Sequence, residues 1–431
     1  MAGCMMDVSR EVFMARKVFC SLFSLLLLCG NLGAETVKIG LNYPKTGPYY
    51  QQGVDQLNGA NLAAEEINAK GGILGKKIEI ITRDSQSKAD VSVKNAEELI
   101  AEGAKMIFGG SSSGVAVAVG EVCQQKGILF FGTLTYSTET TDEKGHRHTF
   151  RECYNSWPAA KVLASYMRRN FTGKRYMYIT ADYTWGYTTE AAFRKLTGTT
   201  SKELHKGVLT RFPGATQEDF KKAIALAKTV KPDVLVLVEF GEDMVMAVRE
   251  ATDQGLKTQI IVPNLTLAMA HGAGPKAMSG VIGALDWSWN IPYQYNYPQG
   301  KSFVEKYEGK YATYPGASAN YCWAILHEYK AAVERAGTFD SAKVIKALEN
   351  HKYQYNKDEQ YWRAFDHSSV QTVYAVRCKP EADVVKDKYK MDYFEVINQM
   401  SGEKAFRTKQ EWMDARSAVN MPPNLEKLPG E

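Results

Sequence analysis

A serine-rich turn flanked by glycines is the segment of this chain best suited to binding chemistry. It reads Gly109-Gly110-Ser111-Ser112-Ser113-Gly114 and lies between a short apolar run, 106–108, and a segment with helical spacing from Val115. Serine hydroxyls and free backbone N–H groups at a helix start attract anions, because the helix dipole places partial positive charge there. The turn therefore predicts an anion site, which a carboxylate would fit.

The same turn satisfies the pattern G-x-S-x-G, which indicates a second chemistry. In that interpretation Ser112 is the nucleophile of a hydrolase on a strand–turn–helix. A hydrolase also needs an acid and a histidine, and none of the downstream histidines lies in a motif that ties it to Ser112. Small residues are common in any tight turn before a helix, so we favour the binding interpretation and keep the secreted serine hydrolase as an alternative.

Strands and helices alternate around this turn and must position it. Strand-like runs and segments with helical spacing alternate from 36 to 131, and the pattern restarts from 157 to 262. Such βαβ repetition requires parallel sheets with helices on both faces. We therefore predict an α/β fold with two doubly wound parallel-sheet lobes and a break near residues 150–155.

Composition narrows the class of protein. The chain has 431 residues, 45% hydrophobic and 23% charged, with a net charge of +5. These values are ordinary for a globular protein of two or three domain-sized units and do not argue for a nucleic-acid partner. Motifs for nucleotides and metals are missing, so we expect neither a cofactor nor a metal site.

The first 34 residues have the pattern of an export signal. Arg16 and Lys17 precede the apolar run 18–28, which ends at small residues near Ala34. We expect residues 1–34 to be a cleaved signal peptide, with Met14 a candidate for the true start. Anchoring as a lipoprotein at Cys29 is the alternative, which the preceding Leu28 disfavours. Four cysteines follow the signal, and the sequence does not choose a disulfide pairing among Cys123, Cys153, Cys322 and Cys378.

The stretch from Gly47 to Gly110 resembles a known family over its whole length. The similarity rests on Asn58-Gly59-Ala60, on the helix end Ala64–Lys70 and on Gly71-Gly72-Ile73-Leu74-Gly75-Lys76-Lys77. It is similar to the opening of the Leu/Ile/Val-type periplasmic solute-binding proteins of ABC transporters, which have the type I periplasmic-binding fold. The resemblance implies a periplasmic protein that captures a small ligand between two lobes, does no chemistry on it and delivers it to a membrane permease.

The resemblance also implies how the chain divides. Three strands of a hinge are expected to join the lobes. The first lobe is expected to hold residues 35–152 and about 287–366. The second is expected to hold residues 153–286 and about 367–431, with a C-terminal extension.

Ligand contacts carry over by resemblance to positions in both lobes. Ser112 and Ser113 would hold a carboxylate, and the loop 132–138 would add Leu134 with either Thr135 or Tyr136. Gln52 occupies a place where the family often has an aromatic side chain. In the second lobe, Trp185 and Phe240 match aromatic residues that close over the ligand.

Position 264 departs from the family pattern. The residue after Pro263 is usually the acid that pairs with the ammonium group of an amino acid, and here it is the neutral Asn264. A buried ammonium without a counter-charge is costly. Either Glu239 supplies that charge, or the ligand has no ammonium and is a small carboxylate, an amide or an aromatic acid. The same fold also serves as a ligand-sensing receptor ectodomain, which remains an alternative to transport.

Overall fold

The core of the first lobe is a parallel sheet, whose first strand begins at Thr36. The computed structural model describes residues 35–431, so the expected signal peptide and Cys29 lie outside the described residues. Five strands run in the order β2-β1-β3-β4-β5. They are β1 (Thr36–Tyr43), β2 (Lys77–Asp84), β3 (Met106–Gly109), β4 (Leu129–Gly132) and β5 (Thr149–Arg151).

Helices cover both faces of this first sheet. Helices α3 (Ala89–Ala101) and α4 (Ser113–Lys126) pack against each other on one face, and α2 (Tyr50–Ala69) packs with α13 (Ala317–Ala336) on the other. Successive strand residues point to opposite faces, so Ile107 belongs to the small core under α3 and α4, whereas Met106 and Phe108 belong to the large core. Helix α14 (Ser341–Leu348) also packs on α13. A small sheet completes the lobe with β11 (Lys352–Tyr353), β12 (Gln360–Trp362) and β13 (Ser369–Val370).

The second lobe contains a sheet of seven strands in the order β15-β14-β10-β9-β8-β6-β7. Its parallel strands are β6 (Tyr176–Ala181), β7 (Lys206–Thr210), β8 (Val234–Val238), β9 (Gln259–Val262) and β10 (Ile282–Leu285). Its antiparallel strands are β14 (Val373–Cys378) and β15 (Phe394–Met400). Strand β8 reads Val-Leu-Val-Leu-Val and is buried throughout, as a strand covered on both faces requires.

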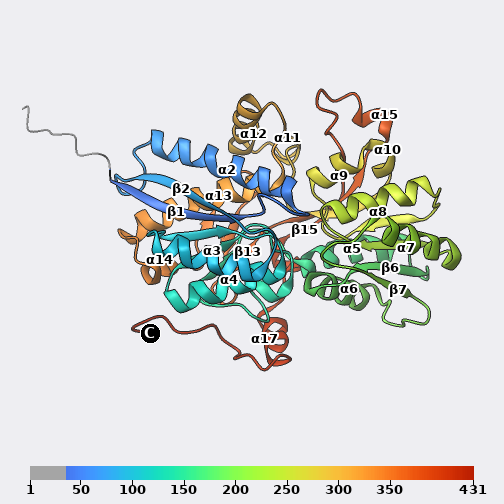
Figure 1. The fold of residues 1–431 in the computed structure, drawn as a ribbon, viewed down its shortest axis with the longest axis horizontal. Coiled ribbons are helices and arrows are strands. Elements are labelled where there is room, and N and C mark those ends of the chain that lie inside the picture. The colour runs from blue at the N-terminus through green and yellow to red at the C-terminus, as the bar shows by residue number, and fades with distance from the viewer. Residues whose placement is uncertain (1–34) are drawn as a thin grey trace, which may run out of the picture.

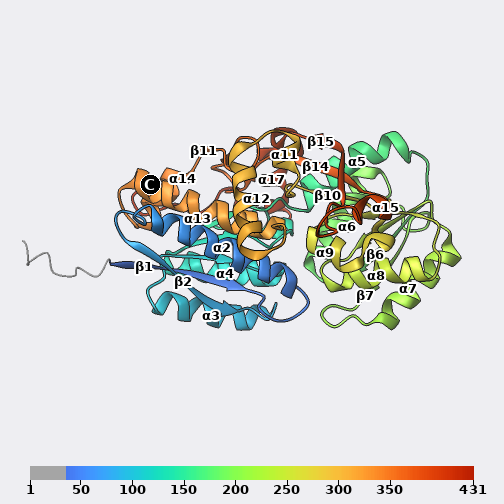
Figure 2. The same ribbon diagram turned by 90° about the horizontal axis from the view of Figure 1, so that it is seen from above.

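Helices flank the second sheet as they flank the first. They are α5 (Ser156–Asn170), α6 (Thr184–Thr197), α7 (Gln217–Val230), α8 (Glu242–Asp253), α9 (Leu267–Ala273) and α10 (Pro275–Met278). The two lobes lie side by side along the longest axis of the molecule (Figure 1, Figure 2). The prediction of an α/β fold with two doubly wound parallel-sheet lobes is confirmed.

A buried lysine links the connections that join the lobes. The chain crosses near residues 152–155, 286–297 and 371–372. Lys357 Nζ donates to Asp286 O in the second crossing and to Thr372 O in the third, each at 2.6 Å. Gln371 Nε2 donates to Glu152 O at 2.6 Å and so connects the third crossing to the first. These hydrogen bonds connect the three crossings to one another.

Residues after 400 differ from the expected division. We expected 367–431 to belong to the second lobe. Strands β14 and β15 do so, but α17 (Lys409–Ser417) and the residues after it pack on the first lobe, where Trp412 Nε1 donates to Thr141 O at 3.0 Å. The physical reason is burial: the Trp412 ring contacts Phe365 and is fully enclosed. The remaining helices are α11 (Ile291–Gln294), α12 (Pro298–Tyr311), α15 (Glu381–Val384), α16 (Gly402–Ala405) and the 3₁₀ turn η1 (Thr138–Thr140).

The four cysteines of the described chain are free and buried. They are Cys123, Cys153, Cys322 and Cys378. Burial raises the pKa of each thiol, so all four pack as small hydrophobic groups. Among residues 35–431, no helix is long and apolar enough to cross a membrane.

Candidate functional site

The serine turn lies at the carboxyl end of β3, where the first lobe faces the second. Gly109 has a φ of +121° and Gly110 a φ of +100°. A Cβ atom at Gly109 would collide with the carbonyl oxygen of Asn42 in β1, so only glycine fits there. The turn therefore brings the chain across the sheet edge and directly into the N-terminus of α4.

The hydroxyls of the turn differ in what they bind. Ser111 Oγ pairs with Ser85 Oγ at 3.1 Å, so its side chain is held in the first lobe. Ser112 is the N-cap of α4, but its side chain makes no capping bond. Ser113 is buried, and its Oγ has no hydrogen-bond partner among the described residues. Two hydroxyls at a helix start thus remain available to a carboxylate.

The loop after β4 lies beside this turn and is tied to it. Gln56 on α2 donates from Nε2 to Thr133 Oγ1 at 2.9 Å and to Gly110 O at 3.4 Å. Its Oε1 has no partner within the described chain. Leu134, Thr135 and Tyr136 follow and are all buried. We call residues 133–137 the ligand loop.

Within the ligand loop the three predicted side chains have different environments. Thr135 Oγ1 pairs with Thr140 Oγ1 at 2.6 Å, so that hydroxyl is used inside the first lobe. The Tyr136 ring instead reaches the second lobe and contacts Phe240 with ring centroids 5.3 Å apart. This difference makes Tyr136, rather than Thr135, the side chain of this pair that lies between the lobes.

The second lobe presents an aromatic ring and an amide that hold each other. Trp185 lies in the first turn of α6, and Asn264 follows β9. Trp185 Nε1 donates to Asn264 Oδ1 at 3.3 Å. An indole N–H can only donate, so the oxygen of the Asn264 amide must face it. Asn264 Nδ2 is then left as a buried donor with no partner among the described residues.

Aromatic rings from both lobes meet around Phe240. The Phe240 ring contacts Tyr49 at 5.4 Å, Tyr136 at 5.3 Å and Trp185 at 5.9 Å between centroids. Tyr49 also shares a hydrogen bond of 3.0 Å with Tyr183 of the second lobe. Since Tyr49 and Tyr136 belong to the first lobe, these contacts describe lobes that are closed on each other.

Gly241 allows this approach. It has a φ of +63°, and a Cβ atom there would lie 2.7 Å from Pro48 O and 2.7 Å from a ring carbon of Tyr49. Both neighbours belong to the first lobe. The closed arrangement therefore depends on a glycine at the N-cap of α8.

Carboxyl groups near the aromatic cluster are buried and favour the neutral form. Glu239 Oε1 accepts from Thr210 Oγ1 at 2.5 Å, whereas its Oε2 has no partner among the described residues. Burial raises the pKa of Glu239 well above its usual value, and the nearby Asp243 raises it further. Burial raises the pKa of Asp243 to about 7.

Comparison with known proteins decides the family. A profile for periplasmic binding proteins matches residues 36–384. The chain belongs to the periplasmic binding protein family. Leu/Ile/Val-binding protein homolog 1 of Brucella suis is 28% identical over 317 residues, which cover 72% of this chain and 82% of the relative. The resemblance to Leu/Ile/Val-type solute-binding proteins is confirmed.

Solved structures show the same fold. A periplasmic binding protein from Burkholderia mallei has a TM-score of 0.79 with 25% identity and covers 88% of this chain and 98% of its own. A solute-binding protein from Rhodopseudomonas palustris, solved with 3,4-dihydroxybenzoic acid, has a TM-score of 0.74 with 19% identity and covers 85% and 98%.

The hydrolase alternative finds no support in this binding protein. The family is one of solute-binding proteins and not a family of enzymes. Among the described residues, no histidine is hydrogen-bonded to Ser112. His205 accepts from Tyr176 N, and His367 pairs with Glu349.

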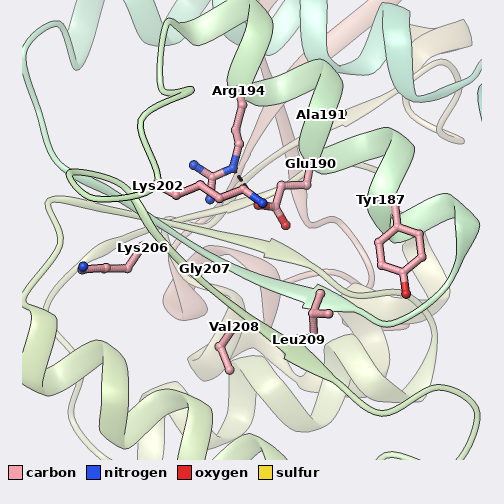
Figure 3. Close-up of a pocket in the computed structure, with 9 residues that line it drawn as sticks. All are labelled: Tyr187, Glu190, Ala191, Arg194, Lys202, Lys206, Gly207, Val208 and Leu209. Atoms are coloured by element: carbon pink, nitrogen blue, oxygen red, sulfur yellow. Dashed lines mark hydrogen bonds and ion pairs between the residues drawn. The ribbon is translucent and has the colours of Figure 1, made fainter. Parts of the chain in front are cut away.

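A hollow lies away from the candidate ligand contacts of this binding protein. It has a volume of about 460 Å³ and lies between α6 and the edge strand β7 (Figure 3). Arg194 lines it, with Nε bonded to Glu190 Oε1 at 2.6 Å. Lys202 and Lys206 add positive charge. None of the predicted ligand contacts lines this hollow.

The structure joins four of the nine predicted contacts in one cluster and adds other residues to it. Tyr136, Trp185 and Phe240 join one aromatic cluster that also includes Asn264 through Trp185. Gln52 is buried in the first turn of α2, and its side chain makes no hydrogen bond with the other described residues. Sequence reasoning missed Tyr49, Gln56 and Phe212, whose ring contacts Tyr49 at 6.2 Å. A signal existed for Gln56 alone, since it lies one helical turn after Gln52.

Proposed function

We propose that this chain is an extracytoplasmic solute-binding protein of an ABC importer, which captures a small carboxylate without an ammonium group. The predicted signal peptide supports export, and the family supports transport. Delivery to a membrane permease is part of the proposal.

The unpartnered Asn264 Nδ2 is the observation that carries the ligand class. At this position the family pattern has an acid, whose oxygens accept from an ammonium. Here the Trp185 indole occupies the amide oxygen, and a buried donor remains. A buried donor without a partner costs about 1–3 kcal/mol, so the site favours a ligand that brings an acceptor to it.

The first lobe suits the other end of such a ligand. Ser112 and Ser113 at the start of α4 offer hydroxyls and backbone N–H groups to a carboxylate. Between these ends, Tyr49, Trp185 and Phe240 suit an apolar or flat body. Burial raises the pKa of Glu239, so its charged form is costly in the unliganded site.

Ligand capture follows from the closed arrangement. The ligand would first dock on the serine turn and the ligand loop of the first lobe. Rotation about the crossings would then bring Trp185, Phe240 and Asn264 over it. Closure removes the ligand from water and strengthens each polar contact.

A thermal-shift screen of the chain from residue 35 tests the proposal. The panel contains amino acids, amides, short aliphatic acids and aromatic acids. A ligand that binds only the folded state raises the melting temperature by several degrees at about 100-fold excess over its Kd. We expect the shifts among acids without an ammonium. A panel in which no class produces a shift would overturn the binding function.

A further inference from the structure

The chain passes between the lobes a fourth time after β15. Strand β15 is paired with β14 in the second sheet, and α16 packs on α5 of the second lobe. Helix α17 lies on the first lobe, so residues 401–408 cross from one lobe to the other. In both ribbon views the tail then runs from the junction of the lobes toward the outer end of the first lobe (Figure 1, Figure 2). The match to the family ends at residue 384, before this segment.

The tail holds one segment of the first lobe along much of its length. Arg416 Nη1 donates to Asp142 O at 2.9 Å and to Gly145 O at 3.0 Å. Glu426 Oε2 accepts from Arg147 N at 2.9 Å, and its Oε1 pairs with His146 Nδ1 at 2.6 Å. These bonds fix the backbone of residues 141–147, which follow the ligand loop after the 3₁₀ turn η1.

Arg407 links this segment to the second lobe with one side chain. Its Nη1 donates to Asp142 Oδ2 at 2.9 Å and to Glu143 Oε1 at 2.8 Å. Its guanidinium carbon lies 4.9 Å from the ring centroid of Trp157, on α5 of the second lobe. The planar guanidinium thus stacks on one lobe while its N–H groups bind the other.

Asp142 connects Arg407 to the ligand loop through Arg151. Its carboxylate is almost fully buried and lies 3.7 Å from Arg151 Nη2, in addition to Arg407. Arg151 Nη1 donates to Ser137 O at 2.7 Å, at the end of the ligand loop. A buried carboxylate that loses one of two cationic partners forces its surroundings to rearrange. Loss of Arg407 would therefore loosen Arg151 and the loop that it holds.

We propose that residues 401–431 form a fourth connection between the lobes, and that Arg407 is a positioning residue that fixes the ligand loop relative to the second lobe and so slows ligand release. The inference rests on the proposed function for the ligand, but the fixing of the loop does not depend on it. A loop ordered in advance loses less conformational entropy when the ligand binds.

The test compares Arg407→Gln with Arg407→Lys and with Lys409→Gln. Lys409 is exposed in the same tail, and its substitution removes the same charge. Among the described residues, its side chain makes no hydrogen bond or ion pair with the first lobe. Amide hydrogen exchange of residues 133–147 is measured without ligand, together with the melting temperature. Stopped-flow measurement of ligand dissociation follows, with the tightest binder of the screen.

We expect Arg407→Gln to raise exchange in 133–147 and to speed dissociation by about tenfold, the equivalent of about 1.4 kcal/mol. Arg407→Lys should restore part of both, and Lys409→Gln should resemble the unmodified chain. Unchanged exchange in 133–147 would overturn the fourth connection even if no ligand is known. Raised exchange with unchanged dissociation would overturn the role of Arg407 in ligand release. If Arg407→Gln does not fold, Arg407→Lys is measured instead; it keeps the charge beside Asp142 but loses the planar fork, and a smaller rise in exchange and in dissociation rate is then expected.

Discussion

Trp185 and Asn264, which are 79 residues apart in the chain, form a hydrogen bond that sets the polarity of the candidate site. The indole N–H takes the amide oxygen and leaves the amide N–H₂ group as a donor. A carboxylate at position 264 would have left an acceptor in the same place. Asn264 in place of an acid, together with its bond to Trp185, therefore changes which ligand groups the second lobe can hydrogen-bond.

Asn264→Asp should shift the preference of the site toward amino acids. The new carboxylate would still accept from Trp185 and would offer its second oxygen to an ammonium group. Hydrogen bonds to charged groups contribute about 1.5–3 kcal/mol, so we expect a gain of about 10- to 100-fold for amino acids relative to the matching acids. Isothermal titration calorimetry of both ligand classes measures this change.

Glu239→Gln is the matched control for that experiment. Burial raises the pKa of Glu239, and an acid without an ammonium brings it no positive charge, so the amide should leave the affinity for such acids nearly unchanged. If Glu239→Gln abolishes binding of an amino acid that the unmodified chain binds well, Glu239 supplies the counter-charge and the proposed ligand class is wrong.

Ser113→Ala should weaken carboxylate binding without lowering stability. The Ser113 hydroxyl is buried and has no partner among the described residues, so its removal takes away no bond of the unliganded protein. We expect a loss of about tenfold in affinity by calorimetry. In Ser111→Ala the hydroxyl bonded to Ser85 is lost, which should lower the melting temperature and spare affinity. The reverse pattern would place the carboxylate elsewhere.

Gly241→Ala should oppose closure of the lobes. A Cβ atom at this position would press on Pro48 and Tyr49 of the first lobe. Gly198→Ala is the control, because Gly198 also has a positive φ, +74°, but a Cβ atom there meets nothing within 4 Å. Both variants carry backbone strain of about 1–2 kcal/mol, and only Gly241→Ala should bind ligand more weakly and give a larger radius of gyration in small-angle X-ray scattering. Equal affinities in the two variants would contradict the closed contact at Gly241.

Stability should fall as the pH rises from about 4.5 to about 7, partly through Glu152. The pKa of Glu152 is raised to about 7, mainly by burial; bonds from Tyr353 and Gln360 and the charge of Lys357 oppose the rise, and the nearby Asp286 adds to it. The folded chain thus keeps a proton that the unfolded chain has already lost, so stability present at low pH is lost through this window.

Urea unfolding at pH 5 and pH 8 checks this prediction. Glu152→Gln should reduce the difference in unfolding free energy between the two pH values by up to about 3 kcal/mol, since one pKa unit corresponds to about 1.4 kcal/mol. The exposed Glu97→Gln should leave the difference unchanged. A Glu152→Gln variant with the full pH dependence would show that Glu152 is charged in the folded state.

The elements that position the site were predictable, because periodicity is local. The alternation of strand-like and helical segments over 36–131 and 157–262 predicted the two sheets and their helices. The contacts of Tyr49 with Phe212 and Phe240 were not predictable, because they exist only once the two lobes are placed together. The fourth crossing was missed for the same reason: Trp412 Nε1 binds the carbonyl of Thr141, which precedes it by 271 residues.

Calorimetry with pairs of ligands that share a carbon skeleton tests the central claim most directly. The pairs are phenylalanine with 2-hydroxy-3-phenylpropanoate and leucine with 2-hydroxy-4-methylpentanoate, each titrated into the chain from residue 35. In each acid a hydroxyl that can accept from Asn264 Nδ2 stands where the amino acid has its ammonium. The account predicts that in at least one pair the acid without the ammonium binds about tenfold or more tightly than the amino acid. Tighter binding of the amino acid in every pair that binds would contradict it.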